Sequence, residues 1–437
     1  MAWEASAALR FGGIVFLMAL GVPVAFAFLA VNLVGVFVLM GGEAGLLQLV
    51  ASSSEAVTKF TLVPVPMFLL MGELFFHTGL AKRVFDALDI WFGRLPGRLC
   101  YVTVAGGTAF ATLSGSSMAN TAMMGALMVP EMTRRGYKKK MAIGPILGTG
   151  ALAMIIPPST LAVLLGTLAR IDIGALLIAG ILPGLLLAAS YAAMIYLQIR
   201  IDPDAAPAYD IDSRSSSAQW RTATLNFVPM LLVVVVVVGM IIFGVATPTE
   251  AAAFGVLGVV LLAAGFRCLT WKAVVASTSS TLAVTAMVFL IIIGSSTFSQ
   301  LLAFSGATSG ILSLLSGVDA SPLVMLVAMF AVLLFLGCFM DQVSIMLLTL
   351  PLFIPLAQNL GFDLVWFGLL LLLGLEVGLI TPPFGLLLFV MMGTAPKGTT
   401  LPEIALAGVP SLACALLVVV AVVVFPQLAL YLPSLIR

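Results

Sequence analysis

The chain has 437 residues, of which 62% are hydrophobic and 8% charged, and its net charge is +1. Ordinary soluble domains carry about 25% charged residues, so this composition excludes a soluble globular fold. Apolar runs such as residues 227–245 exceed the roughly 18 residues that mark a candidate membrane-spanning helix. Barrel strands would alternate apolar and polar residues, whereas these runs are apolar throughout. We therefore predict an all-α polytopic membrane protein.

Residues 98–133 form the first predicted element with a functional signature. This segment is too long for one crossing of about 20 residues and too short for two crossings plus a turn, so we predict a re-entrant hairpin. Its tip, residues 114–121, reads SGSSMANT and would lie deep in the hydrocarbon core. Polar backbone at that depth is tolerated only inside protein or beside a water-filled cavity. A packing patch of small residues is the alternative, but the five polar side chains favour a loop whose oxygens bind a cation.

A helix predicted over residues 141–169 is interrupted by the doublet Pro157-Pro158. Proline lacks a backbone donor and clashes with the preceding turn, so two prolines in succession predict an unwound stretch in mid-span. A simple proline kink is the alternative. The carbonyls of Ala153 and Ile156 are expected to lose their helical partners. Such carbonyls suit sodium, and the N-terminus of the following half-helix suits a carboxylate.

The second half of the chain repeats this pattern at a constant offset of 225 residues. The matched positions are Pro130 with Pro355, Gly136 with Gly361, and Pro157-Pro158 with Pro382-Pro383. We therefore predict two repeats joined by a hydrophilic cytoplasmic linker. The predicted segments are the first repeat at 1–200, the linker at 201–224, the second repeat at 225–437, a second hairpin at 320–358 and a second broken helix at 363–395.

Acidic residues are rare in the predicted spans. Asp341 is expected near the second hairpin tip, and an intramembrane carboxylate costs about 2.5 to 3.5 kcal/mol on insertion scales, which makes it a functional hypothesis. A structural hydrogen bond to a neighbouring helix is the alternative. Glu73 and Glu376 are expected in or near spans with no identifiable partner, and His77 is expected at an interface without chemistry. The carbonyls of Gly378 and Thr381 are expected to lose their helical partners at the second break.

Lysine and arginine accumulate on the cytoplasmic side of membrane proteins. In the first half they flank the hairpin, whereas the corresponding ends of the second hairpin carry none. The two repeats are therefore predicted to be inverted, with the first hairpin entering from the cytoplasm and the second from the periplasm. With the N-terminus in the periplasm, fifteen of the nineteen basic residues are cytoplasmic, and the exceptions are Arg10, Lys59, Arg170 and Arg437. Inverted repeats are typical of secondary transporters.

Several segments resemble the large membrane subunit of TRAP transporters, the tripartite ATP-independent periplasmic carriers of organic acids within the ion-transporter superfamily. The similar segments are 21–25 (GVPVA), 244–253 (GVATPTEAAA), the SGSS tip and both Pro-Pro breaks. The resemblance covers nearly the whole chain. It implies an elevator mechanism in the bacterial inner membrane, coupling to Na⁺, a small four-helix membrane subunit and a periplasmic binding protein that delivers the substrate. Since the chain starts directly at the first repeat, the small subunit is expected to be a separate polypeptide.

The resemblance also implies site residues. One sodium site would involve Ser114 and the carbonyls of Ala153, Ile156 and Pro158. The other would involve Asp341 and the carbonyls of Gly378, Thr381 and Pro383. The substrate would lie between the two tips, near Ser116, Ser117, Asn120 and Gln342. Because the tips differ, Ser-Ser against Asp-Gln, the two cation sites need not be equivalent.

We therefore expect a permease that imports an organic anion with sodium ions through the lipid bilayer, with no nucleic acid as partner. A stand-alone carrier driven by sodium, or by protons through Asp341, is the second interpretation. A hydrolase using a tip serine would lack a base, because no histidine or lysine is expected near either tip, so we expect no enzyme. An ion channel is disfavoured because pores usually repeat by subunit symmetry. The expected contacts fit a dicarboxylate, a sugar acid or a sulfonate equally.

Overall fold

The computed structural model describes residues 3–93, 95–206, 217–307, 309–310, 313, 321–338, 340–382, 385–396 and 398–435. Within these ranges every regular element is a helix. Seven helical segments are long and apolar enough to cross a membrane: Phe60–His77, Ile173–Ile201, Trp220–Ile242, Pro248–Gly265, Trp271–Phe304, Gln342–Asn359 and Leu401–Val424. The prediction of an all-α polytopic membrane protein is thus confirmed.

The first half of the chain contains the helices up to α11. Their bounds are α1 (Trp3–Ala19), α2 (Val24–Leu39), α3 (Glu43–Val57), η1 (Phe60–Leu62), α4 (Pro64–His77), α5 (Leu80–Phe92), α6 (Arg98–Ser114), α7 (Ser117–Arg134), α8 (Lys139–Ala151), η2 (Leu152–Met154), α9 (Thr160–Ala169), α10 (Ile173–Ala179) and α11 (Ile181–Ile201). A short turn, η3 (Pro203–Ala205), follows.

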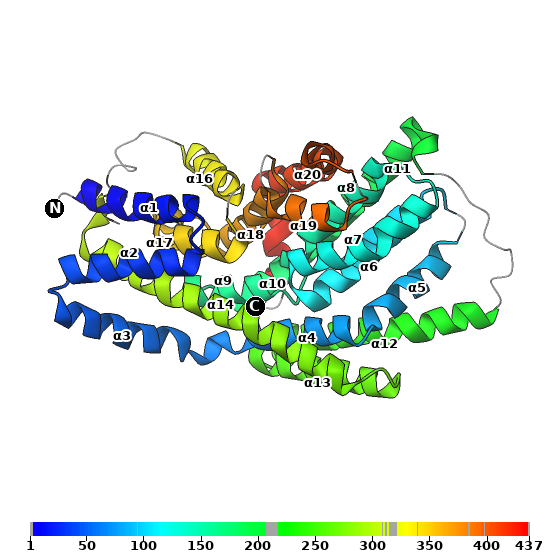
Figure 1. The fold of residues 1–437 in the computed structure, drawn as a ribbon, viewed down its shortest axis with the longest axis horizontal. Coiled ribbons are helices and arrows are strands. Elements are labelled where there is room, and N and C mark those ends of the chain that lie inside the picture. Colours follow the sequence, from blue (N-terminus) through cyan, green and yellow to red (C-terminus); the bar gives the residue numbers. More distant parts are fainter. Residues whose placement is uncertain are drawn as a thin grey trace.

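The second half contains the remaining helices. Their bounds are α12 (Ser217–Ile242), α13 (Pro248–Gly265), α14 (Trp271–Phe304), α16 (Pro322–Gly337), α17 (Gln342–Asn359), α18 (Leu364–Ile380), α19 (Leu386–Thr394), α20 (Leu401–Val424) and α21 (Gln427–Ser434). The N-terminus lies at one end of the long axis of the molecule, and the end of α11 and the start of α12 lie at the other (Figure 1). The predicted linker thus begins and ends at the side opposite the N-terminus.

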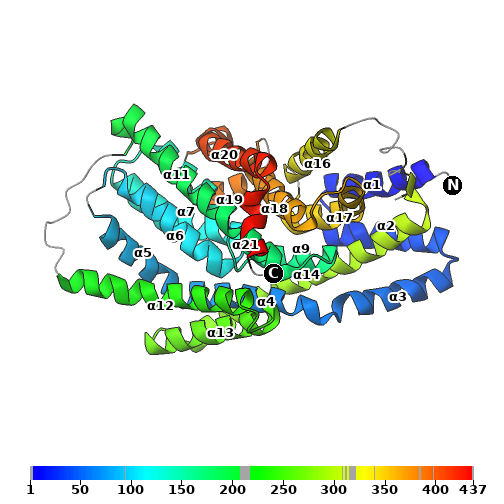
Figure 2. The ribbon, with the colours of Figure 1, turned by 180° about the vertical axis from the view of Figure 1, so that it is seen from behind.

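Helix α18 forms the centre of the fold. Every residue from Val365 to Ile380 is buried, as expected for a helix that is apolar on all sides. It contacts α10, α16, α17 and α20 and lies in the middle of both views (Figure 1 and Figure 2). The long helix α14 crosses the molecule and contacts α2, α3, α4 and α17. Both helices contact α17 of the second predicted hairpin, and α18 also contacts α8, which follows the first.

Helix boundaries recur at the offset found in the sequence. α7 and α17 begin at Ser117 and Gln342 and have 18 residues each, and α8 and α18 begin at Lys139 and Leu364. The matched glycines of the two halves, at 136 and 361, both have positive φ, +80° and +73°, a conformation that glycine adopts without strain. The repeat boundaries and the opposite membrane orientation of the two halves stay predictions.

Backbone packs directly on backbone where α16 ends against α18. A Cβ atom at Gly337 would lie 2.5 Å from the Cα of Gly378, so neither position has room for a side chain. Small residues allow this kind of close approach between membrane helices.

We expect the substitution Gly337→Ala to force these helices apart and to reduce the free energy of unfolding by about 1 to 3 kcal/mol, the usual cost of overpacking. The measurement is the thermal unfolding midpoint of the purified protein in detergent. Gly239→Ala is the matched control, because a Cβ at Gly239 in α12 meets nothing within 4 Å. Equal thermal unfolding midpoints for Gly337→Ala and Gly239→Ala would contradict the close packing of α16 on α18 at Gly337.

Candidate functional site

The first hairpin has a closed tip in the protein interior. α6 ends at Ser114 and α7 begins at Ser117. Gly115 is left-handed (φ +57°), and a Cβ there would lie 2.5 Å from the Thr160 hydroxyl oxygen. Ser116 caps α7 by accepting a hydrogen bond from the Ala119 amide at 3.3 Å. The tip therefore packs against the start of α9, where the first broken helix resumes.

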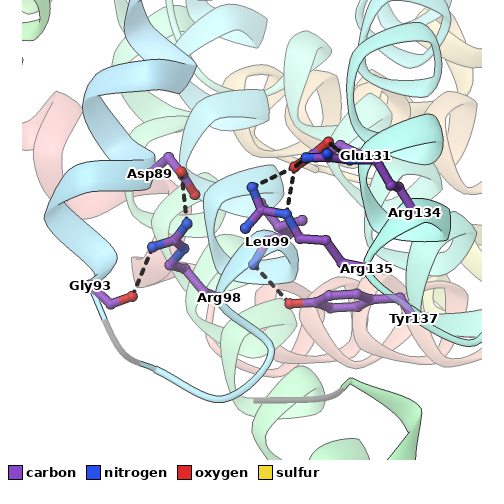
Figure 3. Close-up of polar contacts among 8 residues, drawn as sticks. All are labelled: Asp89, Gly93, Arg98, Leu99, Glu131, Arg134, Arg135 and Tyr137. Carbon is purple, nitrogen blue, oxygen red and sulfur yellow. Dashed lines mark hydrogen bonds and ion pairs between the residues drawn. The ribbon is translucent and has the colours of Figure 1, made fainter. Parts of the chain in front are cut away.

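The open end of this hairpin is held by polar contacts (Figure 3). At the start of α6, Arg98 pairs with Asp89 of α5 at 2.8 Å and donates to the Gly93 carbonyl at 3.0 Å. The Leu99 amide donates to the Tyr137 hydroxyl, just after α7, at 3.4 Å. The start of α6 and the end of α7 thus lie at one end of the molecule, which is the arrangement of a hairpin.

Basic residues concentrate at this open end. Glu131 pairs with Arg134 and Arg135 (Figure 3). Beyond α7, Lys138 and Lys140 lie 2.8 and 2.9 Å from Asp202, at the end of α11. Hydrogen bonds from Lys138 and then Lys140 lower the pKa of the Asp202 carboxyl. The contacts join the hairpin to the start of the predicted linker.

The first predicted helix break is present and buried. α8 ends at Ala151, a 3-10 turn covers Leu152–Met154, and α9 starts at Thr160 with Ser159 as its cap. The amides of Ile155 and Ile156 both donate to the Leu152 carbonyl, at 3.2 and 3.1 Å. The predicted sodium ligands Ala153, Ile156 and Pro158 all lie in this buried segment. The side chain of their predicted companion, Ser114, lies outside the described part of the structure.

At the second tip, Asp341 caps the N-terminus of α17. Its carboxylate accepts hydrogen bonds from the amides of Val343 (3.0 Å) and Ser344 (3.2 Å) and from the Ser344 hydroxyl. The side chain is half-buried. The Cys338 thiol, at the end of α16, lies 3.9 and 3.7 Å from the carbonyl oxygens of Thr381 and Pro382, so α16 ends against the second break.

The expectation of freed carbonyls at this second break is wrong for two residues. The Gly378 carbonyl accepts a hydrogen bond from the Thr381 amide at 3.1 Å, and the Thr381 carbonyl accepts one from the Gly385 amide at 3.1 Å. At Gly378 the last turn of α18 tightens, so that the Thr381 amide replaces the donor that Pro382 lacks, whereas Thr381 keeps the amide four residues ahead as its partner. Pro383, the third predicted carbonyl ligand, lies outside the described residues.

Glu376 was expected to have no identifiable partner, and this is also wrong. The carboxylate, 1% exposed in α18, accepts a hydrogen bond from Ser117 of the first tip at 3.1 Å. Within the described chain its other oxygen has no hydrogen-bond partner. The sequence signal was available, because Glu376 is the one charged residue in the apolar run of α18, but only the fold brings Ser117 to it.

The predicted substrate residues divide into two groups. Ser117 and Asn120 are buried, and the Asn120 amide donates to the carbonyls of Gly107 (3.3 Å) and Thr149 (2.8 Å). Gln342, at the other tip, is 5% exposed. Ser116 instead lines a cavity of about 570 Å³ between α4, α7 and α14.

This cavity also contains Glu73 and His77, which lie 3.2 Å apart. The expectation that Glu73 has no identifiable partner is therefore wrong, and the spacing of four residues was a signal available in the sequence, because such residues are neighbours on a helix. His77, expected to be interfacial, lines a cavity that reaches the first tip.

We expect Ser117→Ala to leave the buried Glu376 carboxylate without its donor and to reduce the free energy of unfolding by about 1 to 3 kcal/mol. The double variant Ser117→Ala/Glu376→Leu should recover part of that free energy, because it removes the buried carboxylate together with its donor and leaves no unpaired polar group. The measurement is a double-mutant cycle of unfolding midpoints in detergent. Ser190→Ala is the control, since that hydroxyl donates to Leu187 in its own helix. Strictly additive effects at Ser117 and Glu376 would show that the contact is absent.

Comparison with known proteins supports a single family. The family model "Tripartite ATP-independent periplasmic transporter, DctM component" matches residues 11–428. The C4-dicarboxylate TRAP transporter large permease of Pseudomonas aeruginosa is 32% identical over 87% of this chain and 88% of its own length. The sialic acid TRAP large permease of Vibrio cholerae is 30% identical over 95% of each chain, and the ectoine TRAP large permease of Halomonas elongata is 30% identical over 96% and 97%.

Solved structures share the fold. The YdaH transporter of Alcanivorax borkumensis superposes with a TM-score of 0.63 at 13% identity, covering 90% of each chain. MtrF of Neisseria gonorrhoeae gives a TM-score of 0.64 at 14% identity, covering 89% of this chain and 85% of its own. Large permeases of the matched family work with a periplasmic binding protein and a small membrane subunit. This chain belongs to the DctM family of tripartite ATP-independent periplasmic transporters, as a multi-pass membrane permease subunit and not an enzyme.

Proposed function

We propose that this permease imports an organic anion into the cytoplasm across the bacterial inner membrane, driven by sodium ions and by an elevator movement of the hairpins. A periplasmic binding protein delivers the substrate, and a small membrane subunit completes the transporter. The family is ATP-independent by description, so accumulation against a gradient requires an ion gradient. The membrane potential contributes about 2.3 kcal/mol per elementary charge per 100 mV, which favours net movement of cations inward.

One observation supports this function above the others: both hairpin tips pack against interruptions in buried helices. Gly115 lies against Thr160 at the first break, and Cys338 lies against Thr381 at the second. Unwound backbone and half-helix ends of this kind bind cations through carbonyl oxygens and anions through helix N-termini. The two tips therefore combine the chemistry that sodium and a carboxylate need.

A carbonyl oxygen that accepts one hydrogen bond, as those of Gly378 and Thr381 do, keeps a second lone pair for a cation. At the first break, the proposed ligands are Ser114 and the carbonyls of Ala153, Ile156 and Pro158. At the second, they are Asp341 and the carbonyls of Gly378, Thr381 and Pro383. A carboxylate has about four lone-pair sites, so Asp341 retains capacity for a cation beside its three capping hydrogen bonds.

The substrate is proposed to be a carboxylate. The relatives are named for C4-dicarboxylate, sialic acid and ectoine, and all three compounds contain a carboxylate group. Ser116, Ser117, Asn120 and Gln342 are the proposed substrate contacts. Both Ser117 and Asn120 are buried here, so Ser117 would reach the substrate only after the tip leaves Glu376 of α18, and Asn120 only after it releases the carbonyls of α6 and α8.

We expect Asp341→Asn to raise the sodium concentration for half-maximal uptake at least tenfold, because the neutral amide loses the charge that binds the cation. Uptake of labelled succinate, N-acetylneuraminate and ectoine is measured in proteoliposomes against increasing external sodium. Asp363→Asn is the matched control, since Asp363 caps α18 with the same geometry, accepting from Val365 at 2.8 Å and Trp366 at 3.1 Å. If Asp341→Asn and Asp363→Asn changed the sodium concentration for half-maximal uptake equally, Asp341 would act only as a helix cap.

We also expect uptake to require all three components. Proteoliposomes with this chain and the small subunit should accumulate acid only when the binding protein is supplied outside, because the carboxylate must be delivered to the tips. Omitting sodium from the complete system should abolish accumulation. Sodium-dependent uptake by this chain alone would overturn the tripartite function and support a stand-alone carrier.

A further inference from the structure

A second cavity, of about 550 Å³, lies away from the predicted substrate residues. It is formed by the end of α3, the end of α9, the C-terminal third of α14 and one face of α17. These elements lie toward the N-terminal end of the molecule, whereas the first cavity lies among α4, α5 and α7 toward the other end (Figure 1). Its volume is in the range of pockets that hold one small organic molecule.

Two cations line this second cavity, Lys59 and Arg170, and Glu55 is the one acid among its described lining residues. Neither cation forms an ion pair within 4.0 Å with a carboxylate of the described chain, in contrast to Arg98 and Lys138 at the hairpin base. The cavity therefore has an excess of positive charge. Lys59, Arg170 and Glu55 are all exposed, and an excess of one sign of charge along a cleft attracts ions of the opposite sign.

Arg170 occupies an unusual backbone position. It ends α9 in the left-handed conformation, with φ 56° and ψ 39°, where glycine is strongly preferred. A long cationic side chain at this position costs backbone strain that glycine would avoid. Glycine would end the helix with less strain, and an arginine here places a cation both at the negative end of the α9 dipole and in the lining of the cavity.

Neutral donors complete the lining. The Ser52 hydroxyl donates to the Gln300 side-chain oxygen at 3.0 Å. This bond orients Gln300, whose amide nitrogen makes no hydrogen bond to another described residue. Ser296 and Ser299, on the same helix as Gln300, add hydroxyl groups to this wall of the cavity. A carboxylate held by charge and hydrogen bonds needs donors of these kinds.

We propose that this cavity binds the carboxylate of the transported organic anion, through Lys59, Arg170 and Gln300, as a site separate from the hairpin tips. The assignment rests on the proposed function, because it takes the transported acid as the ligand. The lining comes from α3, α9, α14 and α17, so a carboxylate here contacts both the second hairpin and helices outside it. The site would hold the anion before the tips receive it.

Thiol modification tests the charge of the cavity without requiring transport. Ser299→Cys places a thiol in this cavity, and Ser280→Cys places one on the same helix in the first cavity. Both are made in the full chain carrying Cys268→Ser, because Cys268 is the native thiol that is not buried. Each is treated with the anionic reagent 2-sulfonatoethyl methanethiosulfonate and the cationic reagent 2-(trimethylammonium)ethyl methanethiosulfonate.

We expect the anionic-to-cationic rate ratio to be at least about tenfold higher for Ser299→Cys than for Ser280→Cys. Adding Arg170→Gly or Lys59→Gln should lower the ratio at least threefold. Arg267→Gly is the matched control, since Arg267 has the same left-handed backbone (φ 55°) but lies outside the cavity. The proposal would be overturned if the anionic-to-cationic rate ratio were equal at the two thiols. It would also be overturned if Arg170→Gly and Lys59→Gln left the ratio at Ser299→Cys unchanged.

The source of the anion is tested with the same thiol. Millimolar succinate, N-acetylneuraminate or ectoine should slow the anionic reagent at Ser299→Cys, and the compound that does so should be the one taken up by proteoliposomes. Slowing only by phosphatidylglycerol would assign the site to a lipid headgroup, and no slowing by any of them would remove the anion site. If the rate ratio is the same at Ser299→Cys and Ser280→Cys while uptake is intact, only this inference is rejected. If none of the three compounds is taken up, the proposed function is rejected.

Discussion

The structure depends on one constraint: backbone polar groups inside a membrane protein have no bulk water to bind, so every interruption of a helix must be satisfied by other parts of the chain. The two breaks meet this need in different ways, the first with help from a hairpin tip and the second within its own turn. Asn120 of the first hairpin donates to the Thr149 carbonyl just before the first break. Gly378 and Thr381 at the second break are satisfied by amides of the same turn.

The same constraint places polar side chains where helices restart. Ser116, Ser159 and Asp341 cap α7, α9 and α17, and each accepts hydrogen bonds from the first amides of its helix. Capping groups at interior helix ends lie beside the positive end of the helix dipole. The positive helix end beside each capping group suits a carboxylate, which is consistent with the substrate contacts proposed at the first tip.

The two cavities differ in chemistry as well as position. The first contains the Glu73–His77 pair and reaches Ser116 at the first tip, and the second contains Lys59 and Arg170 beside the second hairpin. The anion site that we propose therefore lies in only one of the two cavities.

The sequence by itself determined the all-helical fold and the interruption between α8 and α9, because apolar length and paired prolines act locally, and α7 and α17 begin 225 residues apart, the offset read from the sequence. It did not determine which polar groups meet. Glu376 and Ser117 are separated by 259 residues, and Lys59, Arg170 and Gln300 come from three distant segments of the chain. Contacts between remote residues depend on how apolar helices pack, and a pattern along the chain does not encode that packing. Tertiary structure alone therefore decided the partner of the buried carboxylate and the composition of both cavities.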